Sequence, residues 1–540
     1  MTAHQVLLAL RSKGVKLWVD NGRLRYQAAR GTLTSTEIDA LRALRDEILA
    51  FLQQSPATTE EIRLAPRSPS DRVPLAFSQL YLWDALNLDE RPSMRTVAAG
   101  VRLSGRLDID VLRRSFATLF QRHESLRTRV IVVDGAPRQH IDELNGEYPL
   151  EIFDLTHLPN PERELEARRL ARQLAEEPVF LGKGPLFGVR VLKLGNREHV
   201  LIVAADHAVS DAASIGIVWR EIFTAYSHFV RGQSCSLPEV PVQFADFAVW
   251  QQKNHSLWME QHGAYWTRRL AGARRVRLFA NRRLSSQLQW ATQPVEFGQI
   301  LTAGLLQVSR RERTSLVMSV LTAFVALVSR WCDVADLVLP FTTLGRFQPE
   351  VENTIGFFGT PLLLRIELQE EDTFLDLLTR VTREYATAYA HDDSCRVAVQ
   401  TRRPEFTFNP PFNWIPGEFK WQPGESRHEF PTDNYFTLAR FDFEITPYDD
   451  YNWDGEPRID FSDTPDGVIG VIGYRADRFA RDTVATFGRS LRMVAEKLVN
   501  EPHALVKSVG FEPCCAQSAA PADSSPSTET SRCEGRCGSW

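Results

Sequence analysis

The segment EHVLIVAADHAVSDAAS, residues 198–214, joins an apolar run to a short polar turn and the start of a helix. The run has the length of a strand and contains β-branched residues, which indicates a buried strand. Apolar residues then recur at helical spacing over residues 215–229, and Asp211 and Ser214 are suitable caps for that helix. The pattern therefore predicts that a strand delivers His207 to a turn before a helix N-terminus.

The turn carries the kinds of group that acyl-transfer chemistry uses. His207 titrates near neutral pH, and Asp206 and Asp211 are carboxylates that can orient an imidazole. A helix N-terminus offers backbone donors to an oxyanion. A buried histidine among helix caps would show the same residues. The turn alone therefore leaves a catalytic and a structural interpretation open.

Four further segments surround this turn. They are PLAFSQLYLW (residues 74–83), RHESLRT (122–128), FADFAVWQ (244–251) and GRFQPEVENTIGFF (345–358). Their order and spacing resemble those of the condensation domains of nonribosomal peptide synthetases, over residues 72 to 505. The resemblance implies an acyltransferase of nonribosomal peptide or hybrid polyketide biosynthesis. Such an enzyme joins a carrier-bound acyl or peptidyl thioester to an amine or alcohol, as an amide or an ester.

The central motif of that family is His-His-x-x-x-Asp-Gly, and this chain matches it in part. His207 matches the second histidine and Asp211 the aspartate, whereas Asp206 replaces the first histidine and Ala212 the glycine. The resemblance implies that His207 serves as a base or orienting acceptor for the attacking group. It also implies that Asp211 pairs with Arg346 of the downstream segment and holds the loop in shape.

The two departures leave other interpretations open. Asp206, Asp211 and Ser214 also fit the D-x-x-x-x-D-x-x-S pattern of heterocyclisation domains. The flanking segments favour the condensation type, and so does the retained His207, which cyclisation domains usually lack. A further alternative is a catalytically silent domain that recruits another enzyme to a carrier.

Asp206 and Ala212 each admit two local explanations. If the chain stays extended, the Asp206 side chain points away from His207 and only caps or pairs on the far side. If the turn brings the two together, the carboxylate raises the pKa of His207 and makes it a stronger base for a hydroxyl acceptor. At Ala212, either the backbone keeps a negative φ or the loop is slightly displaced.

The first 54 residues form a separate small unit. We expect a short helix that includes residues 6–10 and ends near Gly14, two strands over 15–20 and 23–27 around Asn21-Gly22, and a second helix that begins after Thr34. A helix-hairpin-helix of this size is small for an independent core. Its retention therefore suggests a partner surface.

Residues 1–30 are strongly basic, since they carry six Lys or Arg and one acid, although a solvated basic face would show the same charge. The pattern resembles the N-terminal β-hairpin docking domains (TubC type) of synthetase subunits. That resemblance implies capture of the short acidic C-terminal tail of an upstream carrier protein. The residues we expect to contact the tail are Lys16, Trp18, Arg23, Arg25 and Tyr26.

The main body shows alternating strand and helix signals, which indicates an α/β fold. Residues 106–122 and 317–331 are helical by apolar spacing, and 337–341 reads as a strand. The resemblance implies two lobes like chloramphenicol acetyltransferase that form a V-shaped pseudo-dimer with a tunnel between them. We expect these lobes to span residues 72–240 and 241–508.

The segments beside the lobes differ from them in composition. Residues 55–71 are a Pro/Ser-rich linker, and residues 509–540 read as a disordered tail. Because no adenylation or carrier pattern follows, we expect a stand-alone enzyme without a cofactor of its own, acting on substrates held by the phosphopantetheine of partner carriers. The acceptor is then a second carrier's cargo or a free small molecule.

Composition narrows the partners and the cellular location that we expect. The net charge of −5 predicts no bulk attraction to nucleic acid. No apolar window is long enough for a membrane helix, and the N-terminal apolar run is too short for a secretory signal, so we expect a cytoplasmic monomer. Cys533 and Cys537 lack the neighbouring ligands of a zinc site, and we expect no metal.

Three later segments bear on the tunnel. Residues 358–361 (FGTP) depart from the family's Phe-Val-Asn-Thr, so an Asn that helps shape the tunnel floor is absent. Residues 441–444 (FDFE) resemble a late motif that we place in the second lobe. The aromatic stretches 406–414 and 448–453 either pack in the core or line the acceptor side.

Overall fold

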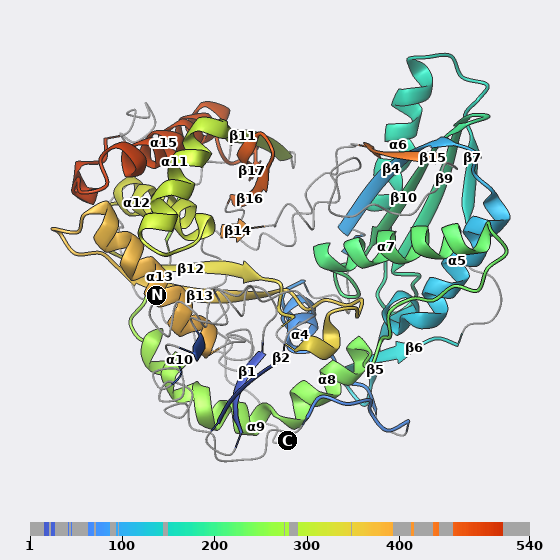
Figure 1. The fold of residues 1–540 in the computed structure, drawn as a ribbon, viewed down its shortest axis with the longest axis horizontal. Helices are drawn as coiled ribbons and strands as arrows, with labels where there is room; N and C mark the ends of the chain where they lie inside the picture. Colours follow the sequence, from blue (N-terminus) through green and yellow to red (C-terminus); the bar gives the residue numbers. More distant parts are fainter. Residues whose placement is uncertain are drawn as a thin grey trace, which may run out of the picture.

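The computed structural model describes fifteen parts of the chain. They are residues 16–20, 23–27, 41–42, 45, 63–69, 72–86, 93–94, 97–143, 150–274, 276–279, 290–346, 348–391, 412–414, 436–441 and 457–510. Two α/β lobes lie side by side (Figure 1). Each is built on one large sheet that carries helices.

The first lobe contains a five-stranded sheet in the order β15-β4-β10-β9-β7. Its strands are β4 (Val97–Gly105), β7 (Glu151–Asp154), β9 (Phe187–Gly195), β10 (Glu198–Ala205) and β15 (Phe436–Phe441). Neighbours are antiparallel except β7 and β9, which are parallel. The helices α5 (Ile109–Arg122) and α7 (Ala212–Phe229) pack on one face, and α6 (Glu162–Glu176) packs on the other.

The central strand β10 explains why its sequence is apolar without alternation. Leu201 and Val203 face the core under α5 and α7, whereas Val200 and Ile202 face the core under α6. A strand buried on both faces needs apolar side chains at every position. The predicted strand is therefore confirmed, and it ends directly before the polar turn.

Strand β15 comes from the second half of the chain but pairs with β4 of the first lobe, from Phe436 opposite Gly105 to Phe441 opposite Gly100. The expectation that the late motif lies in the second lobe is therefore wrong for Phe441, and residues 442–444 lie outside the described residues. The physical reason is burial, because Phe436 packs against the ring of Tyr226 and is only 4% exposed.

The second lobe contains a six-stranded sheet in the order β11-β17-β16-β14-β12-β13. Its strands are β11 (Trp290–Phe297), β12 (Asp336–Thr343), β13 (Thr360–Glu367), β14 (Phe412–Trp414), β16 (Arg458–Thr464) and β17 (Gly467–Arg475). Its helices are α11 (Gly298–Arg311), α12 (Leu316–Cys332), α13 (Phe374–Ala390) and α15 (Arg481–Asn500), which share one core with the sheet (Figure 1).

Shorter elements complete the described structure. They are β1 (Lys16–Asp20), β2 (Arg23–Gln27), α4 (Phe77–Leu86), β3 (Ser93–Met94), η1 (Glu124–Arg127), β5 (Thr128–Val133), β6 (Ala136–Ile141), β8 (Pro178–Val179), α8 (Phe244–Lys253), α9 (His255–Trp258), the π-helix η2 (Met259–Gly263), α10 (Ala264–Arg269), η3 (Pro349–Val351) and η6 (Val506–Ser508). Helices α8 to α10 connect the lobes (Figure 1).

Several local predictions are confirmed. Strands β1 and β2 form the antiparallel hairpin expected around Asn21-Gly22, and α12 and β12 cover the segments predicted for them. Helix α5 begins at Ile109, three residues later than predicted. The helix expected from residue 6 to near Gly14 lies outside the described residues, as do the tail beyond 510, the aromatic stretch 448–453 and residues 406–411 of the other aromatic stretch. Phe412 is fully buried in the second core, which makes it a packing residue.

In the part of the chain that the structure describes, no single helix is long and apolar enough to cross a membrane. Within that same part, only α11 and α12 taken together reach the required apolar length, and they are bent by 105° relative to each other. Many of their side chains are buried in the second core.

Candidate active site

The turn after β10 is held by Asp206, which is fully buried. Its backbone N–H donates to Leu186 O at 2.7 Å, and its Oδ1 accepts from the N–H of Ala208 at 2.7 Å. The N–H of Val209 donates back to Asp206 O at 3.1 Å. These contacts are those of an aspartate that caps a turn, so the geometry favours the first of its two roles.

His207 projects from that turn and is half-buried. Its ring lies against Phe357, with 4.3 Å between the ring centroids. Burial lowers the pKa of His207 because it disfavours the charged imidazolium, Asp211 opposes the shift, and Arg458 of β16 adds to it. The imidazole is therefore neutral near pH 7, which is the form that accepts a proton.

Asp211 begins α7 as its N-cap and is bound by several donors. Its Oδ1 accepts from Ser214 N at 2.8 Å and from Arg346 Nη2 at 3.0 Å, and Ser214 Oγ also lies 2.8 Å from it. Its Oδ2 accepts from the N–H of Phe358 at 3.1 Å. Both carboxylate oxygens thus bind protein groups, and the pairing with Arg346 that the resemblance implied is present.

Arg346 and Ser214 extend this contact to the segment 345–358. Arg346 Nη2 donates to Ser214 Oγ at 2.9 Å, and its guanidinium carbon lies 4.3 Å from the centre of the Phe358 ring. Ser214 Oγ also lies 3.1 Å from Gly356 N and 3.0 Å from Gly356 O. Burial lowers the pKa of Arg346, and Asp211 opposes that shift.

Gly345 allows this segment to turn back on itself. Its φ is +65°, and a Cβ there would lie 1.7 Å from Phe358 O, which no side chain could tolerate. Ala212, by contrast, is the first residue of α7. A helical residue has negative φ, so the alanine fits where the family has glycine.

Sequence reasoning missed two residues that support the turn, both in the segment 74–83. Gln79 is 2% exposed, accepts from Ala76 N at 2.9 Å, and donates through Nε2 to Ala208 O at 2.7 Å. Ser78 Oγ donates to Phe357 O at 2.7 Å. Motif matching had singled out the segment, but nothing local indicated which carbonyls these side chains reach.

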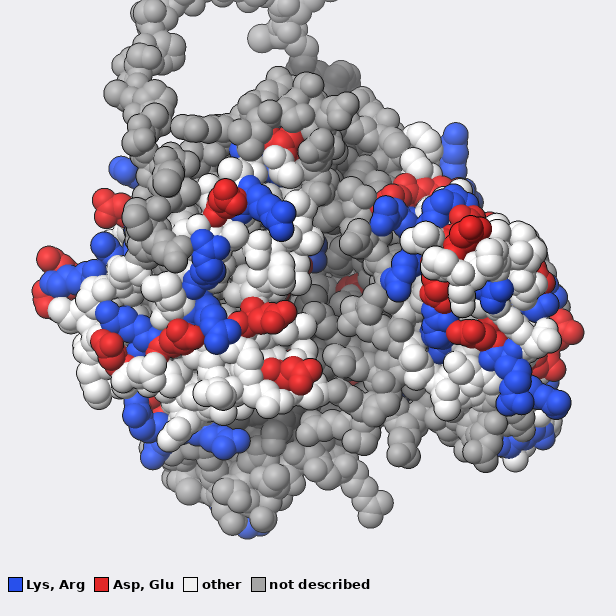
Figure 2. All heavy atoms as spheres, turned by 90° about the horizontal axis from the view of Figure 1, so that it is seen from above, with Lys and Arg blue, Asp and Glu red and all other residues white. Residues whose placement is uncertain are grey.

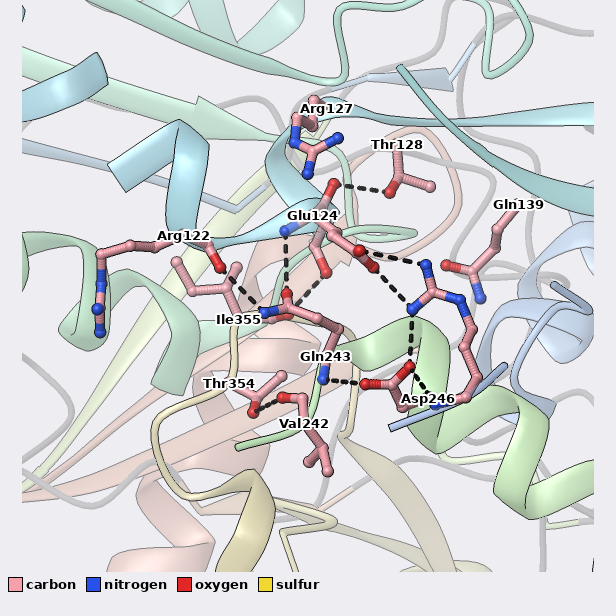
Figure 3. Close-up of polar contacts among 12 residues, drawn as sticks. Arg122, Glu124, Arg127, Thr128, Gln139, Val242, Gln243, Asp246, Thr354 and Ile355 are labelled. Atoms are coloured by element: carbon pink, nitrogen blue, oxygen red, sulfur yellow. Dashed lines mark hydrogen bonds and ion pairs between the residues drawn. The ribbon is translucent and has the colours of Figure 1, made fainter. Parts of the chain in front are cut away.

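A second polar network lies where the lobes meet (Figure 3). Arg67 donates to Asp246 Oδ1 at 2.7 Å and to Glu124 Oε1 at 3.1 Å. Gln243 accepts from Glu124 N at 3.0 Å and donates to Arg122 O at 3.0 Å. Arg67 belongs to the predicted linker, so the end of that linker is fastened to the body by a part-buried ion pair.

Two hydroxyls join the segment 345–358 to the same region. Ser125 Oγ donates to Ile355 O at 2.7 Å, and Thr354 Oγ1 donates to Val242 O at 2.8 Å. The loop that carries Arg346 is therefore anchored at Ser125 and Val242 as well as at Asp211.

The expected docking residues lie on the β1–β2 hairpin, away from these contacts in sequence. Trp18 is the register partner of Arg25, Leu17 of Tyr26, and Asp20 of Arg23. Lys16 pairs with Gln27 at the open end. The hairpin thus presents all five positions on two adjacent strands.

Comparison with known proteins identifies the protein family. Residues 70–513 match the family described as the condensation domain, and residues 4–54 match the TubC N-terminal docking domain. This chain belongs to the condensation domain family, whose members are acyl or peptidyl transferases of nonribosomal peptide synthesis.

Curated relatives are much longer proteins. A component of the linear gramicidin synthase of Brevibacillus parabrevis is 36% identical over 460 residues, which cover 82% of this chain and 8% of that protein. Phosphinothricin tripeptide synthetase PhsC of Streptomyces viridochromogenes is 30% identical over 457 residues, 81% of this chain and 40% of that protein. The chain thus spans less than half the length of either.

Solved structures share the fold. The X-domain from teicoplanin biosynthesis aligns with a TM-score of 0.69 at 22% identity and covers 83% of this chain and 100% of that one. The SgcC5 protein from Streptomyces globisporus aligns at 0.66 and 22% identity, over 80% of this chain and 100% of that one. The first condensation domain of the calcium-dependent antibiotic synthetase aligns at 0.64 and 19% identity, over 83% and 100%.

Proposed function

We propose that this chain transfers an acyl or peptidyl group from the phosphopantetheine thioester of a carrier protein to an amine or alcohol acceptor. The observation that carries the proposal is a half-buried His207 on a turn that Asp206, Gln79 and the Asp211–Arg346 pair all hold in place, with burial lowering the pKa of the imidazole. The chain supplies no group that becomes covalently bound to the substrate in this scheme. The phosphopantetheine belongs to the partner.

In the reaction, the acceptor nitrogen or oxygen attacks the thioester carbonyl carbon. The new C–N or C–O bond forms and the C–S bond breaks, while the acceptor proton passes to His207 and then to the leaving thiolate. General-base assistance of this kind contributes about 10² to 10⁴ in rate. Holding both reactants in one tunnel contributes as much or more.

The N-terminal unit would bring the donor to the site. Its hairpin strands carry Lys16, Arg23 and Arg25, which suit an acidic peptide added as a further strand. The proposed partner is therefore an upstream carrier protein that ends in a short acidic tail.

The test is an acyl-transfer assay with a loaded carrier, read by the intact mass of the carrier and of the product. We expect loss of the acyl mass together with formation of amide or ester, both dependent on the chain. A loaded carrier that binds the chain but keeps its acyl group with every amine and alcohol supplied would contradict the proposal.

That contradictory outcome would favour a second candidate, a silent domain that recruits another enzyme to a carrier. The replacement of the family's first histidine by Asp206 favours this candidate. Binding of the loaded carrier without turnover is its distinguishing result.

A further inference from the structure

Polar side chains form a row across three neighbouring strands of the second lobe. Thr342 of β12, Asn413 of β14 and Asp460 of β16 are register partners. Thr342 Oγ1 donates to Asn413 Oδ1, and Asn413 Nδ2 donates to Asp460 Oδ1 at 2.7 Å. Arg458 Nε donates to both oxygens of Asp460, at 2.9 and 2.8 Å. The row therefore ends in a guanidinium whose orientation is set by a carboxylate.

The row lies on the face of the sheet opposite the aromatic core. Its sequence neighbours Phe341, Phe412 and Phe461 point the other way and are between 0 and 6% exposed. Side chains alternate between the faces of a strand, so the polar residues point away from the helices that cover the core. That face is turned toward the first lobe (Figure 1), and the surface is hollowed between the lobes (Figure 2).

Arg458 lies on this face of the sheet, and its side chain is 56% exposed. It is near enough to His207 for its charge to contribute to the lowered pKa of the imidazole. Gly473 of β17 is its register partner, and a Cβ there would meet nothing within 4 Å, so the space beside Arg458 is open. Val471, opposite Asp460, is 37% exposed and adds an apolar surface. This face of the second-lobe sheet thus offers a cation, open space and an apolar patch.

A guanidinium binds carboxylates with two parallel hydrogen bonds. Besides a carboxylate, the proposed reaction contains one other anion, the phosphate of the donor's pantetheine arm. The thioester at one end of that arm must lie at His207, so the phosphate at the other end of the arm lies away from the reacting centre. A ligand at Arg458 is therefore on the acceptor. A carrier-tethered aminoacyl group has no free α-carboxylate, because its α-carboxyl carbon is the thioester.

We propose that the acceptor is a free amino or hydroxy acid whose carboxylate binds Arg458 while its amine or hydroxyl lies at His207. This inference rests on the proposed acyl transfer and adds the class of acceptor. Asp460 is a positioning residue for Arg458, supported by Asn413 and Thr342.

The experiment compares each amino or hydroxy acid with its primary amide as acceptor, for the wild type and for Arg458→Gln. The donor is supplied both on its carrier and as a phosphate-free N-acetylcysteamine thioester. We expect the wild type to prefer the acid, and Arg458→Gln to lower kcat/KM for the acid about 10- to 100-fold while leaving the amide nearly unchanged. Arg458→Lys, which keeps the charge but loses the planar fork, should recover part of the loss.

Arg169→Gln is the matched control, since Arg169 forms a two-point pair with Glu166 on α6 and its side chain is 59% exposed, against 56% for Arg458. Equal wild-type use of acid and amide would overturn the inference, and so would an equal loss for both acceptors in Arg458→Gln. A loss confined to the carrier-borne donor would assign Arg458 to the phosphate and overturn it too. If the wild type uses no acceptor at all, the proposed function itself fails.

Discussion

Arg346 Nη2 lies 3.0 Å from Asp211 Oδ1, although 135 positions separate the two residues in the chain. Their side chains are 10% and 8% exposed, so the pair is largely removed from water, and Ser214 and Phe358 add hydrogen bonds to it. This contact ties the cap of α7 to the segment 345–358. The turn that carries His207 is consequently shaped by both halves of the chain.

Asp211 is expected to support the fold and not to contact the substrate. Removing its carboxylate should therefore lower the free energy of unfolding. Asp211→Ala leaves a buried guanidinium without its partner, which costs about 3 to 5 kcal/mol. Thermal unfolding should register the loss. Asp110→Ala is the control, because Asp110 is 90% exposed and forms a surface ion pair with Arg113, and we expect a change within about 0.5 kcal/mol. Similar melting curves for both variants would refute the structural role.

The acid limb of the pH–activity profile should lie at a pH below the usual pKa range of histidine. Burial and Arg458 lower the pKa of His207 while Asp211 opposes them, so the neutral base persists as the pH falls through 6.5. We expect kcat/KM to stay level through pH 6.5 and to fall only below it. Arg458→Gln removes one of the causes that lower the pKa of His207, so the acid limb should move to higher pH. A limb above pH 6.5 in the wild type would contradict this assignment.

Asp206 should affect the protein by holding the turn that carries His207, and not by assisting the imidazole directly. Asp206→Asn keeps an Oδ1 that can accept from Ala208, so we expect unchanged stability and an unchanged ratio of ester to amide formation with matched acceptors. Asp206→Ala loses that acceptor and should cost about 1 kcal/mol of unfolding free energy. If Asp206→Asn or Asp206→His selectively lowers ester formation, the carboxylate instead assists His207.

Deleting residues 1–54 should weaken encounter with the upstream carrier while leaving turnover at saturating carrier unchanged. We expect KM for the carrier to rise on the order of tenfold, because charge complementarity mainly sets the rate of association. Added salt should raise KM of the full chain and have less effect on the truncated one. An unaltered KM after truncation would show that the unit does not dock this carrier.

Local sequence was sufficient for the strand before His207, the cap by Asp211 and the β1–β2 hairpin, because each depends on residues within a few positions of one another. The Asp211–Arg346 contact came from the family resemblance. The strand β15 could not be placed, since the burial of Phe436 against Tyr226 has no local signature. Gln79 and Arg458 escaped notice for the same reason. Gln79 bonds to Ala208 of the turn, and Arg458 acts on His207 through its charge, in both cases across long separations in the chain.

The central claim is that His207 is the base for acyl transfer, and His207→Ala tests it most directly. The measurement is single-turnover transfer from a loaded carrier, followed by intact mass, together with thermal unfolding and carrier binding of the same variant. We predict a rate at least about 100-fold lower, with unfolding and carrier binding close to the wild type. Transfer within about tenfold of the wild-type rate would contradict the account and leave proximity as the source of catalysis.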